Sequence, residues 1–309
     1  MINFLYCFDK NYLQQAKTSI SSLLRNVSEK ITIHIICDSK KSSSEIFNIF
    51  KEHPKIEDIK TYHIQADNYT FPKVDGSHVS NATYFRMFID RFLPEDLKQV
   101  VYLDADVICM KDPIIQLKTV SKELANSGFG LAALTEATRK EAPIIFNKLK
   151  LNHDNYFNAG VVMINYEFWK KNSVGNSLID IMENRGDDLI FWDQDVLNIF
   201  FDDEYIKFSN TLNYNFTQLD KINNNEIVFL HYAGKGKPWD VENIVKTFSR
   251  PYQKEYSKLG IQTYHVVFKR NKKTIKSFIK VLFKLQFMNL EKPFTYIALS
   301  LKSFIKNEN

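Results

Sequence analysis

The stretch Val100-Val101-Tyr102-Leu103-Asp104-Ala105-Asp106-Val107-Ile108 places two carboxylates, one residue apart, at the end of an apolar run. Alternate side chains of a β-strand point to the same face, so Asp104 and Asp106 are expected to project together. Two like charges on a buried strand are costly unless another group neutralises them. A divalent cation does so, and its open coordination positions then suit diphosphate oxygens. The alternative is that the strand ends at Leu103 and that both acids lie in a solvated turn.

Strand-like and helix-like segments alternate on both sides of this stretch. The expected strands are Ile2–Phe8, Ile31–Cys37, Ile59–Ile64, Gln99–Ile108, Gly130–Leu134, Gly160–Asn165 and Ile227–His231. The expected helices are Tyr12–Leu24, Ser44–Glu52 with Ser42, Ser43 and Ser44 as possible caps, Ala82–Phe92, Val174–Asn184 and Asp195–Phe201, the last beginning near Asp193. This alternation predicts an α/β domain with a largely parallel sheet. Ligands of such sheets bind beyond the carboxyl ends of the strands, where Asp9 and the aspartate pair are both expected.

The composition supports a globular protein with a sizeable core. The chain has 309 residues, 44% of them hydrophobic, which is enough for one large domain or two ordinary ones. Its three cysteines, Cys7, Cys37 and Cys109, lie in apolar runs and indicate buried free thiols in a reducing compartment. Asp9 and Lys10 interrupt the first apolar run before a secretory segment is complete, and no apolar stretch reaches the roughly 18 residues of a spanning helix. We therefore expect a cytoplasmic protein without a membrane-spanning part.

The net charge of +5 is unevenly distributed along the chain. Residues 265–309 carry +8, whereas residues 1–264 carry −3. In the C-terminal segment two apolar helical stripes are expected, at Ile275, Phe278, Ile279, Leu282, Phe283 and Leu285, and at Phe294, Ile297, Ala298, Leu301, Phe304 and Ile305. Lys273, Lys276, Lys280 and Lys284 share the side opposite the first stripe. The pattern predicts a main domain over 1–264 and a basic amphipathic segment over 265–309 that contacts an anionic membrane surface. The alternative is a helical hairpin that covers the core.

A second segment with suitable chemistry runs from His231 to Trp239, His-Tyr-Ala-Gly-Lys-Gly-Lys-Pro-Trp, after a predicted strand. His231 can complete an Asp/Asp/His set, a mixture of hard oxygens and an imidazole that suits Mn²⁺. The glycines let backbone amides approach a phosphate, and Lys237 adds a positive charge for it. The alternative is an ordinary basic turn that contains a structural histidine.

Three more segments can line a ligand site: Ser80–Arg86, Phe157–Val161 and Trp192–Asn198. Arg86 either clamps a carboxylate or diphosphate or pairs on the surface. Asn158 stands beside two small residues, so backbone and amide can approach a polar ligand there, or the segment is a simple turn into a strand. Asp193 either caps the helix that follows or, together with Gln194, faces a sugar.

The order of these motifs resembles glycosyltransferase family 8, which includes bacterial lipooligosaccharide α-galactosyltransferases and glucosyltransferases and glycogenin. Over about residues 1–250 the matching motifs are Phe8–Tyr12, Thr83–Arg86, Tyr102–Asp106, Phe157–Gly160, Asp193–Asp195, His231-Tyr232 and Lys237–Trp239. Asp-x-Asp is shared by many glycosyltransferases, so the specificity of the resemblance comes from the ordered set. The resemblance implies a glycosyltransferase A-type fold, one α/β domain that uses a UDP-sugar and Mn²⁺, or Mg²⁺ in its place.

Carried over by position, the resemblance implies that Asp104, Asp106 and His231 bind the metal. The residues that it implies for the bound donor are Cys7, Phe8, Asp9, Tyr12, Arg86, Asp104, Ala105, Asp106, Asn158, Ala159, Asp193, Gln194, His231, Gly234 and Lys237. Among these, Gln194 faces the anomeric carbon, Lys237 offsets charge on the departing UDP, and Asp193 is the nucleophile if a covalent intermediate forms. Two positions depart from the family pattern: Phe8 replaces a small residue of the galactosyltransferases, and Glu136 stands near an Asp of those enzymes.

The function expected from this resemblance is retaining transfer of galactose or glucose from a UDP-sugar to a glycan or glycolipid acceptor such as lipooligosaccharide. Gln194 is a poor nucleophile, so front-face displacement is favoured, with a UDP oxygen taking the acceptor proton. The protein is expected at the inner face of the cell membrane, without a nucleic-acid partner. The alternatives are a metal-dependent nucleotidyltransferase, which normally shows an early Gly/Arg-rich triphosphate loop, a non-catalytic membrane-associated sugar-binding protein, and a nucleic-acid binder.

Overall fold

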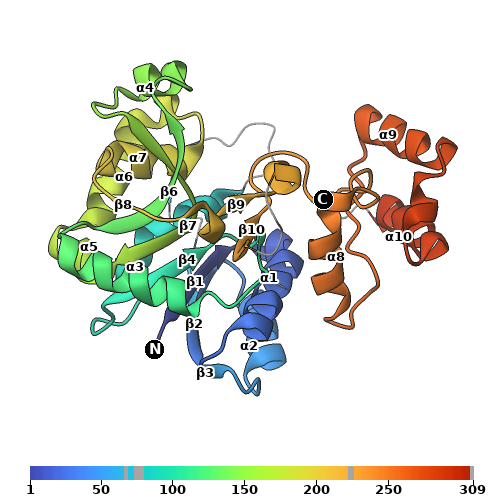
Figure 1. The fold of residues 1–309 in the computed structure, drawn as a ribbon, viewed down its shortest axis with the longest axis horizontal. Coiled ribbons are helices and arrows are strands. Elements are labelled where there is room, and N and C mark those ends of the chain that lie inside the picture. Colours follow the sequence, from blue (N-terminus) through green and yellow to red (C-terminus); the bar gives the residue numbers. More distant parts are fainter. Residues whose placement is uncertain (66–68, 73–79, 222–225, 307–309) are drawn as a thin grey trace.

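A computed structural model describes residues 1–65, 69–72, 80–221 and 226–306 and has a seven-stranded sheet at its centre (Figure 1). The strands are β1 (Asn3–Phe8), β2 (Ile31–Cys37), β3 (Ile56–His63), β4 (Gln99–Leu103), β6 (Leu131–Thr138), β7 (Asn155–Asn165) and β8 (Ile206–Lys207). They are arranged in the order β3-β2-β1-β4-β7-β6-β8. Among these seven strands β7 alone runs antiparallel to its neighbours. The predicted α/β domain with a mostly parallel sheet is confirmed.

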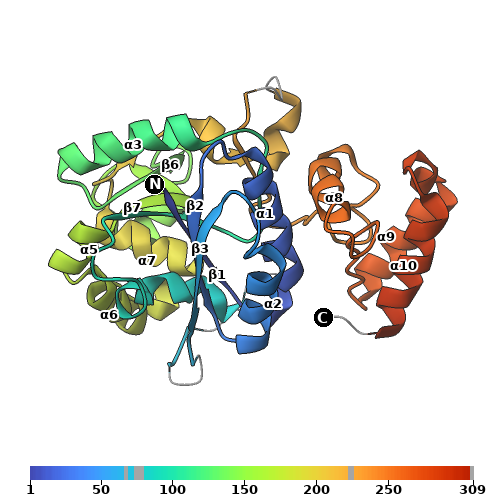
Figure 2. The same ribbon diagram turned by 90° about the horizontal axis from the view of Figure 1, so that it is seen from below.

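Helices cover both faces of this sheet, as the view in Figure 2 shows. One face packs against α1 (Leu13–Asn26), α2 (Lys40–Phe50) and α3 (Ile114–Ser127). The other packs against the 3₁₀ segment η3 (Asn81–Arg91) and the helices α5 (Tyr166–Lys171), α6 (Val174–Arg185) and α7 (Trp192–Phe201). Neighbouring strand residues alternate between the two cores, with Tyr6 in the first and Cys7 in the second. Because both faces are covered, the central strands β1 and β4 are apolar along nearly their whole length, whereas the edge strand β3 carries polar residues such as Glu57, Asp58 and Lys60.

A small second sheet beside the first corrects the interpretation of the aspartate pair. It is formed by β5 (Val107–Cys109), β10 (Phe229–His231) and β9 (Tyr214–Asn215), in the order β5-β10-β9. The predicted strand over 99–108 is therefore divided: β4 ends at Leu103 in the large sheet and β5 begins at Val107 in the small one. The expectation that the two aspartates share one strand face is wrong, because the chain turns between two sheets at this point. The strand does end at Leu103, as in the alternative, but the turn is largely buried: Asp106 is 6% exposed and the side chain of Asp104 is 28% exposed.

Several element boundaries also differ from the sequence prediction. Helix α2 begins at Lys40, and Ser39 caps it by accepting a hydrogen bond from the Ser42 amide. The proposed caps at Ser42, Ser43 and Ser44 are wrong because these residues lie inside the helix. Strand β6 continues to Thr138 and β7 begins at Asn155, since the backbone ladder extends through polar residues that interrupt the apolar pattern.

The C-terminal part forms a separate group of helices to one side of the sheet (Figures 1 and 2). It contains α8 (Arg250–Ser257), α9 (Lys272–Phe283), the 3₁₀ segment η8 (Gln286–Asn289) and α10 (Pro293–Lys306). Helix α8 lies against α1, where Arg25 Nε is 3.0 Å from Glu255 Oε2. Side chains of α9, η8 and α10 share a small core with Val241, Ile244, Tyr264, Val266 and Phe268. The division at residues 264 and 265 stays a prediction, and residues 307–309 of that segment lie outside the described residues.

Within the described ranges, no helix is both long and apolar enough to cross a bilayer.

The remaining helix of the main domain, α4 (Pro143–Leu149), follows β6 and packs its Phe146 and Leu149 against Tyr156 of β7. All three cysteines are buried.

His265 connects α8 to the chain that leads into the C-terminal helices. Its Nδ1 lies 2.7 Å from the Tyr252 hydroxyl, and its ring stacks on Trp239 and Tyr256 at centroid distances of 5.7 and 5.0 Å. Burial lowers the pKa of His265 from 6.5 to about 3. The imidazole is therefore neutral in the folded protein at neutral pH.

We predict that this histidine makes the fold acid-sensitive. Between about pH 6.5 and pH 3 the unfolded chain binds a proton at His265 that the folded protein excludes, so acidification destabilises the fold. From pH 6 to pH 4 the wild type should lose about 1.4 kcal/mol of unfolding free energy per pH unit relative to His265→Phe, which keeps the aromatic stacking. Urea unfolding at several pH values measures this difference, and parallel pH profiles for the two proteins would contradict it.

Candidate active site

A cavity of about 850 Å³ opens beyond the carboxyl ends of β1 and β4. The predicted site residues that line it are Cys7, Phe8, Tyr12, Arg86, Asp104, Ala105, Asp106, Asn158, Ala159, Asp193, Gln194, His231, Gly234 and Lys237. Asp9 does not line it, because its carboxylate accepts hydrogen bonds from the amides of Asn11 and Tyr12 and caps the short helix η1 (Lys10–Tyr12). The structure therefore brings nearly the whole predicted set to one place, while the role of each residue stays a prediction.

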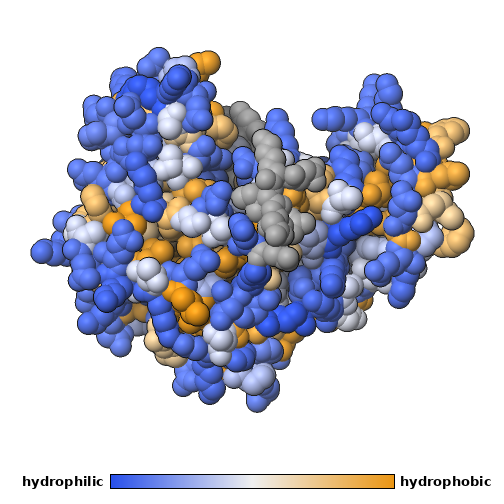
Figure 3. All heavy atoms as spheres, in the orientation of Figure 1, coloured by the Kyte–Doolittle hydropathy of each residue, from blue (hydrophilic) through white to orange (hydrophobic). Residues whose placement is uncertain are grey.

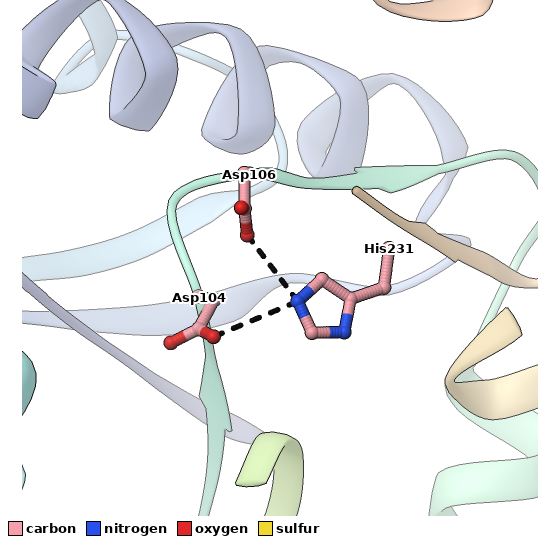
Figure 4. A group of neighbouring side chains, drawn as sticks. All are labelled: Asp104, Asp106 and His231. Carbon is pink, nitrogen blue, oxygen red and sulfur yellow. Dashed lines mark ion pairs between the residues drawn. The ribbon is translucent and has the colours of Figure 1, made fainter. Parts of the chain in front are cut away.

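Asp104, Asp106 and His231 converge on one point in this cavity (Figure 4). His231 Nε2 lies 3.6 Å from Asp104 Oδ2 and 3.4 Å from Asp106 Oδ1. One ligand atom from each of the three side chains lies within 4.8 Å of the other two. Asp106 Oδ1 is buried and accepts no hydrogen bond from the part of the chain that the structure describes, so an acceptor aimed at this point is unused. Two carboxylate oxygens and an imidazole nitrogen fit a divalent cation.

Each aspartate is held by a cation on the side away from His231. Lys237 is buried, and its Nζ donates to Asp106 Oδ2 at 2.5 Å and to the Tyr232 carbonyl at 2.8 Å. Although burial disfavours the charged carboxylate, Lys237 and His231 together lower the pKa of Asp106. Asp104 Oδ1 accepts from Arg86 Nη2 at 2.9 Å and from the Tyr102 hydroxyl at 2.6 Å. Both acids thus turn their second oxygen toward the imidazole.

The Arg86 guanidinium is buried between two carboxylates. Besides Asp104 it contacts Asp193, whose Oδ2 lies 2.8 Å from Nε, and it lies 3.8 Å from the centre of the Tyr102 ring. It also donates to the Ala159 carbonyl. In this geometry Arg86 fixes the positions of Asp104 and Asp193 relative to each other, and its expected contact with a diphosphate stays a prediction.

The start of α7 forms the wall opposite the metal cluster. The expectation that Asp193 caps this helix is wrong, because Asp195 accepts from the Ile190 and Phe191 amides at 2.5 and 2.6 Å. Asp193 instead accepts from the Thr83 hydroxyl and pairs with Arg86. Burial raises the pKa of Asp193 to about 6, against the opposing effect of Arg86.

Gln194 is oriented by contacts at both ends of its amide. Its Oε1 accepts from the Ala159 amide at 3.0 Å, and its Nε2 donates to Glu136 Oε2 at 3.0 Å and to the Tyr156 hydroxyl at 3.1 Å. Glu136, which departs from the family pattern, therefore lies in the site and accepts a hydrogen bond from Gln194.

Several residues of the cavity were missed by sequence reasoning. Tyr156, Ile145, Ile190 and Phe191 line it, and Asn213 lies behind His231, with Oδ1 2.9 Å from His231 Nδ1. The apolar residues resemble core positions in the sequence, and Asn213 is one of many asparagines in the chain. No local signal distinguishes them, because their positions depend on which strands become neighbours.

Comparison with known proteins agrees with this geometry. An α/β fold with an Asp-x-Asp pair and a histidine at the edge of the sheet is the arrangement expected of a glycosyltransferase of the A type. The chain belongs to glycosyl transferase family 8, whose profile matches residues 3–243. The predicted family and class of enzyme are therefore confirmed.

Two curated relatives are similar over about three quarters of the chain. "Glycosyltransferase GlyF" of Streptococcus pneumoniae is 25% identical over 246 residues, which cover 76% of this chain and 56% of that protein. The lipopolysaccharide 1,3-galactosyltransferase of Salmonella typhimurium is 28% identical over 254 residues, which cover 77% of this chain and 72% of that protein. The chain thus spans little more than half the length of the first relative.

The fold is similar to a crystal structure of the galactosyltransferase LgtC in complex with donor and acceptor sugar analogs. The TM-score is 0.71 at 18% sequence identity, over 89% of this chain and 100% of that one. At this identity the likeness concerns the fold, and it confirms the glycosyltransferase A-type architecture.

We predict that Gly160→Ala disrupts the metal cluster without unfolding the protein. An ideal Cβ at residue 160 would lie 2.7 Å from His231 Nε2 and still closer to Cε1, so the imidazole must move. Binding of Mn²⁺, measured by electron paramagnetic resonance of the free ion in the presence of UDP, should weaken at least about tenfold. Gly186→Ala is the control, because its Cβ meets only the flexible ring of Pro72, at 3.2 Å. Unchanged affinity in Gly160→Ala would contradict the placement of His231.

Proposed function

We propose that this protein is a retaining hexosyltransferase that transfers galactose or glucose from a UDP-sugar, with Mn²⁺, to a glycan or glycolipid acceptor. The observation that carries the proposal is the convergence of Asp104, Asp106 and His231 in one cavity, with Lys237 beside them. A nucleotidyltransferase or a non-catalytic sugar-binding protein is less favoured, since the chain belongs to a glycosyltransferase family.

In this proposal the metal cluster and Lys237 act on the diphosphate. A divalent cation bound by Asp104, Asp106 and His231, Mn²⁺ or alternatively Mg²⁺, would supply Lewis-acid stabilisation of the leaving group. The Lys237 ammonium, already held beside Asp106, adds a fixed positive charge where negative charge grows as the bond to the sugar breaks. Arg86 supports this arrangement by holding Asp104 from behind and is proposed to contact the diphosphate.

The sugar is proposed to bind between Asn158, Ala159, Asp193 and Gln194. The Gln194 amide is held at both ends, which directs it rigidly into the cavity. An amide is a weak nucleophile, so we favour front-face displacement, in which a phosphate oxygen of the departing UDP takes the acceptor proton. Asp193 is the alternative nucleophile for a covalent intermediate, but its carboxylate already pairs with Arg86 and Thr83.

The nucleoside is proposed to lie against Cys7, Phe8, Tyr12 and the backbone of Ala105, with Gly234 near the phosphates. Burial raises the pKa of the Cys7 thiol, which therefore stays neutral in this wall. Asp9 is proposed to contribute indirectly, by holding the turn that it caps. Its carboxylate already accepts hydrogen bonds from the amides of Asn11 and Tyr12.

Asp104→Asn tests the proposal. The substitution removes one negative ligand oxygen, and Mn²⁺-dependent hydrolysis or transfer of UDP-galactose or UDP-glucose should fall at least about a hundredfold, or about 2.7 kcal/mol in transition-state stabilisation. The matched control is Asp154→Asn, an exposed acid that pairs only with Arg139 at the surface and should retain activity. Near-normal metal-dependent turnover by Asp104→Asn, or a wild type inactive with every UDP-sugar, would overturn the assignment.

The acceptor is proposed to be a membrane-linked glycan, and the C-terminal segment over 265–309 to hold the enzyme at the inner face of the cell membrane. One relative is named as a lipopolysaccharide galactosyltransferase. Helices α9 and α10 bury Phe278, Val281 and Tyr296 in the core that they share with the preceding chain, yet Phe283 is 86% exposed, Ile305 75% and Phe294 74%. Figure 3 shows apolar side chains gathered at the far end of the molecule, over these helices. Exposed apolar side chains beside lysines suit an anionic lipid surface.

Vesicle flotation tests this part of the proposal. A variant with Phe283→Ser, Phe294→Ser and Ile305→Ser should lose most binding to vesicles that contain phosphatidylglycerol, since about 25 cal/mol per Å² of apolar burial is removed. Ile115→Ser is the control, because Ile115 is 77% exposed on α3, away from the tail. Equal flotation of the triple variant and the wild type would contradict membrane contact, and salt-dependent DNA binding would identify the other partner.

A further inference from the structure

Asn213 lies at the centre of a chain of side-chain hydrogen bonds behind the cavity. It is 2% exposed and stands just before β9, 18 residues from His231 in the sequence. Its Oδ1 is 2.9 Å from His231 Nδ1, and its Nδ2 donates to Asn158 Oδ1 at 2.9 Å. Asn213 thus contacts a residue of the metal cluster on one side and a residue of the sugar wall on the other.

The chain continues across the sugar wall. Asn158 Nδ2 donates to Glu136 Oε2 at 3.2 Å, and the same oxygen accepts from Gln194 Nε2 at 3.0 Å. His231, Asn213, Asn158, Glu136 and Gln194 are therefore connected by consecutive hydrogen bonds. They come from β10, the chain before β9, β7, β6 and α7, so five parts of the fold meet in this chain.

Two fixed groups set the direction of every bond in the chain. The Gly160 amide can only donate, and it donates to Asn158 Oδ1 at 2.9 Å, so this atom is an acceptor. The Glu136 carboxylate accepts, so Asn158 must present its Nδ2 there. Asn213 then has to give its Nδ2 to Asn158, which leaves only its Oδ1 for His231. Because Oδ1 is an acceptor, His231 must carry a proton on Nδ1, which leaves Nε2 as the nitrogen that faces the two aspartates and can bind a metal.

We propose that Asn213 is a positioning residue that fixes the Nδ1–H tautomer of His231 and so directs the Nε2 lone pair at the metal site. The inference rests on the metal site of the proposed function. The hydrogen bond that orients a ligating histidine also fixes its ring angle and raises its basicity, and its loss lowers metal affinity about 10- to 100-fold. Asn213 and His231 are both buried, so water cannot replace the bond at no cost.

The chain also connects the metal ligand to the group proposed to face the anomeric carbon. If Asn213 is removed, Asn158 Oδ1 loses one of its two donors and keeps the Gly160 amide, so the Asn158 side chain and its hydrogen bond to Glu136 are held less firmly. Asn213 therefore positions the two ends of the site together, although it does not line the cavity.

Two substitutions at residue 213 separate the proposed role from general packing. Asn213→Leu keeps a similar volume and removes both hydrogen bonds. Asn213→Asp keeps an acceptor for His231 Nδ1–H. It replaces the Nδ2 donor with an oxygen, so the hydrogen bond to Asn158 Oδ1 is lost. Asn26→Leu is the control, since Asn26 also uses its amide for two protein contacts, to the Ser22 and Cys109 carbonyls, outside the site.

The first measurement is the imidazole ¹⁵N NMR spectrum at pH 8 without metal or nucleotide, with the His231 signals assigned by comparison with His231→Gln. We expect a proton on His231 Nδ1 in the wild type, Asn26→Leu and Asn213→Asp, whether or not Nε2 also carries one, and an Nδ1 without a proton in at least part of the Asn213→Leu population. A wild type without a proton on Nδ1 would overturn the proposal, and this result requires only that the His231→Gln variant used for the assignment folds.

The second measurement is Mn²⁺ affinity in the presence of saturating UDP, read from the resonance of the free ion. Asn213→Leu should bind Mn²⁺ about 10- to 100-fold more weakly than the wild type, and Asn213→Asp within a fewfold of it. Wild-type affinity and tautomer in Asn213→Leu would overturn the role of Asn213. A wild type that binds no Mn²⁺ with UDP would instead overturn the metal site of the proposed function, while the NMR measurement still decides the tautomer.

Discussion

Two negative charges held in one largely buried turn are the constraint on which the cavity depends. Asp104 and Asp106 cannot stay ionised beside each other in a low-dielectric site unless positive groups and hydrogen-bond donors surround them. Lys237 meets Asp106 from 131 residues away in the sequence, and Arg86 meets Asp104 from 18 residues away. The small second sheet positions the first of these cations, and η3, packed on the large sheet, positions the second.

The neutralisation of the two carboxylates is incomplete, and the oxygens that remain favour the binding of a cation. Each cation takes one carboxylate oxygen and leaves the other directed toward the His231 imidazole, where Asp106 Oδ1 has no donor. A site that is prepared for one more positive charge binds a cation without first rearranging its ligands. Arg86 also pairs with Asp193, so one set of buried ion pairs connects the Asp104 side of the cavity with the start of α7.

The fold was predictable where the local pattern was unambiguous. The strand over Ile31–Cys37 has the predicted limits, because it is mostly apolar, apart from Thr32 and His34, and is bounded by the polar residues Lys30 and Asp38. The division between β4 and β5 was not predictable, since the run from Gln99 to Ile108 has the pattern of one strand and only pairing with β10 shows where the second sheet begins. The start of α2 was misplaced because four serines before and within the helix, Ser39 and Ser42 to Ser44, have similar capping ability.

The sequence by itself determined the residue types and the order of the motifs, and these fix the family and the chemistry available to the site. Tertiary structure decided which of these residues meet. It showed that the two aspartates are brought together by a turn between two sheets, that Asp195 and not Asp193 holds the start of α7, and that Asn213 supports His231. The physical reason is that such contacts join positions far apart in the chain, and their formation depends on strand order and burial, which no local pattern records.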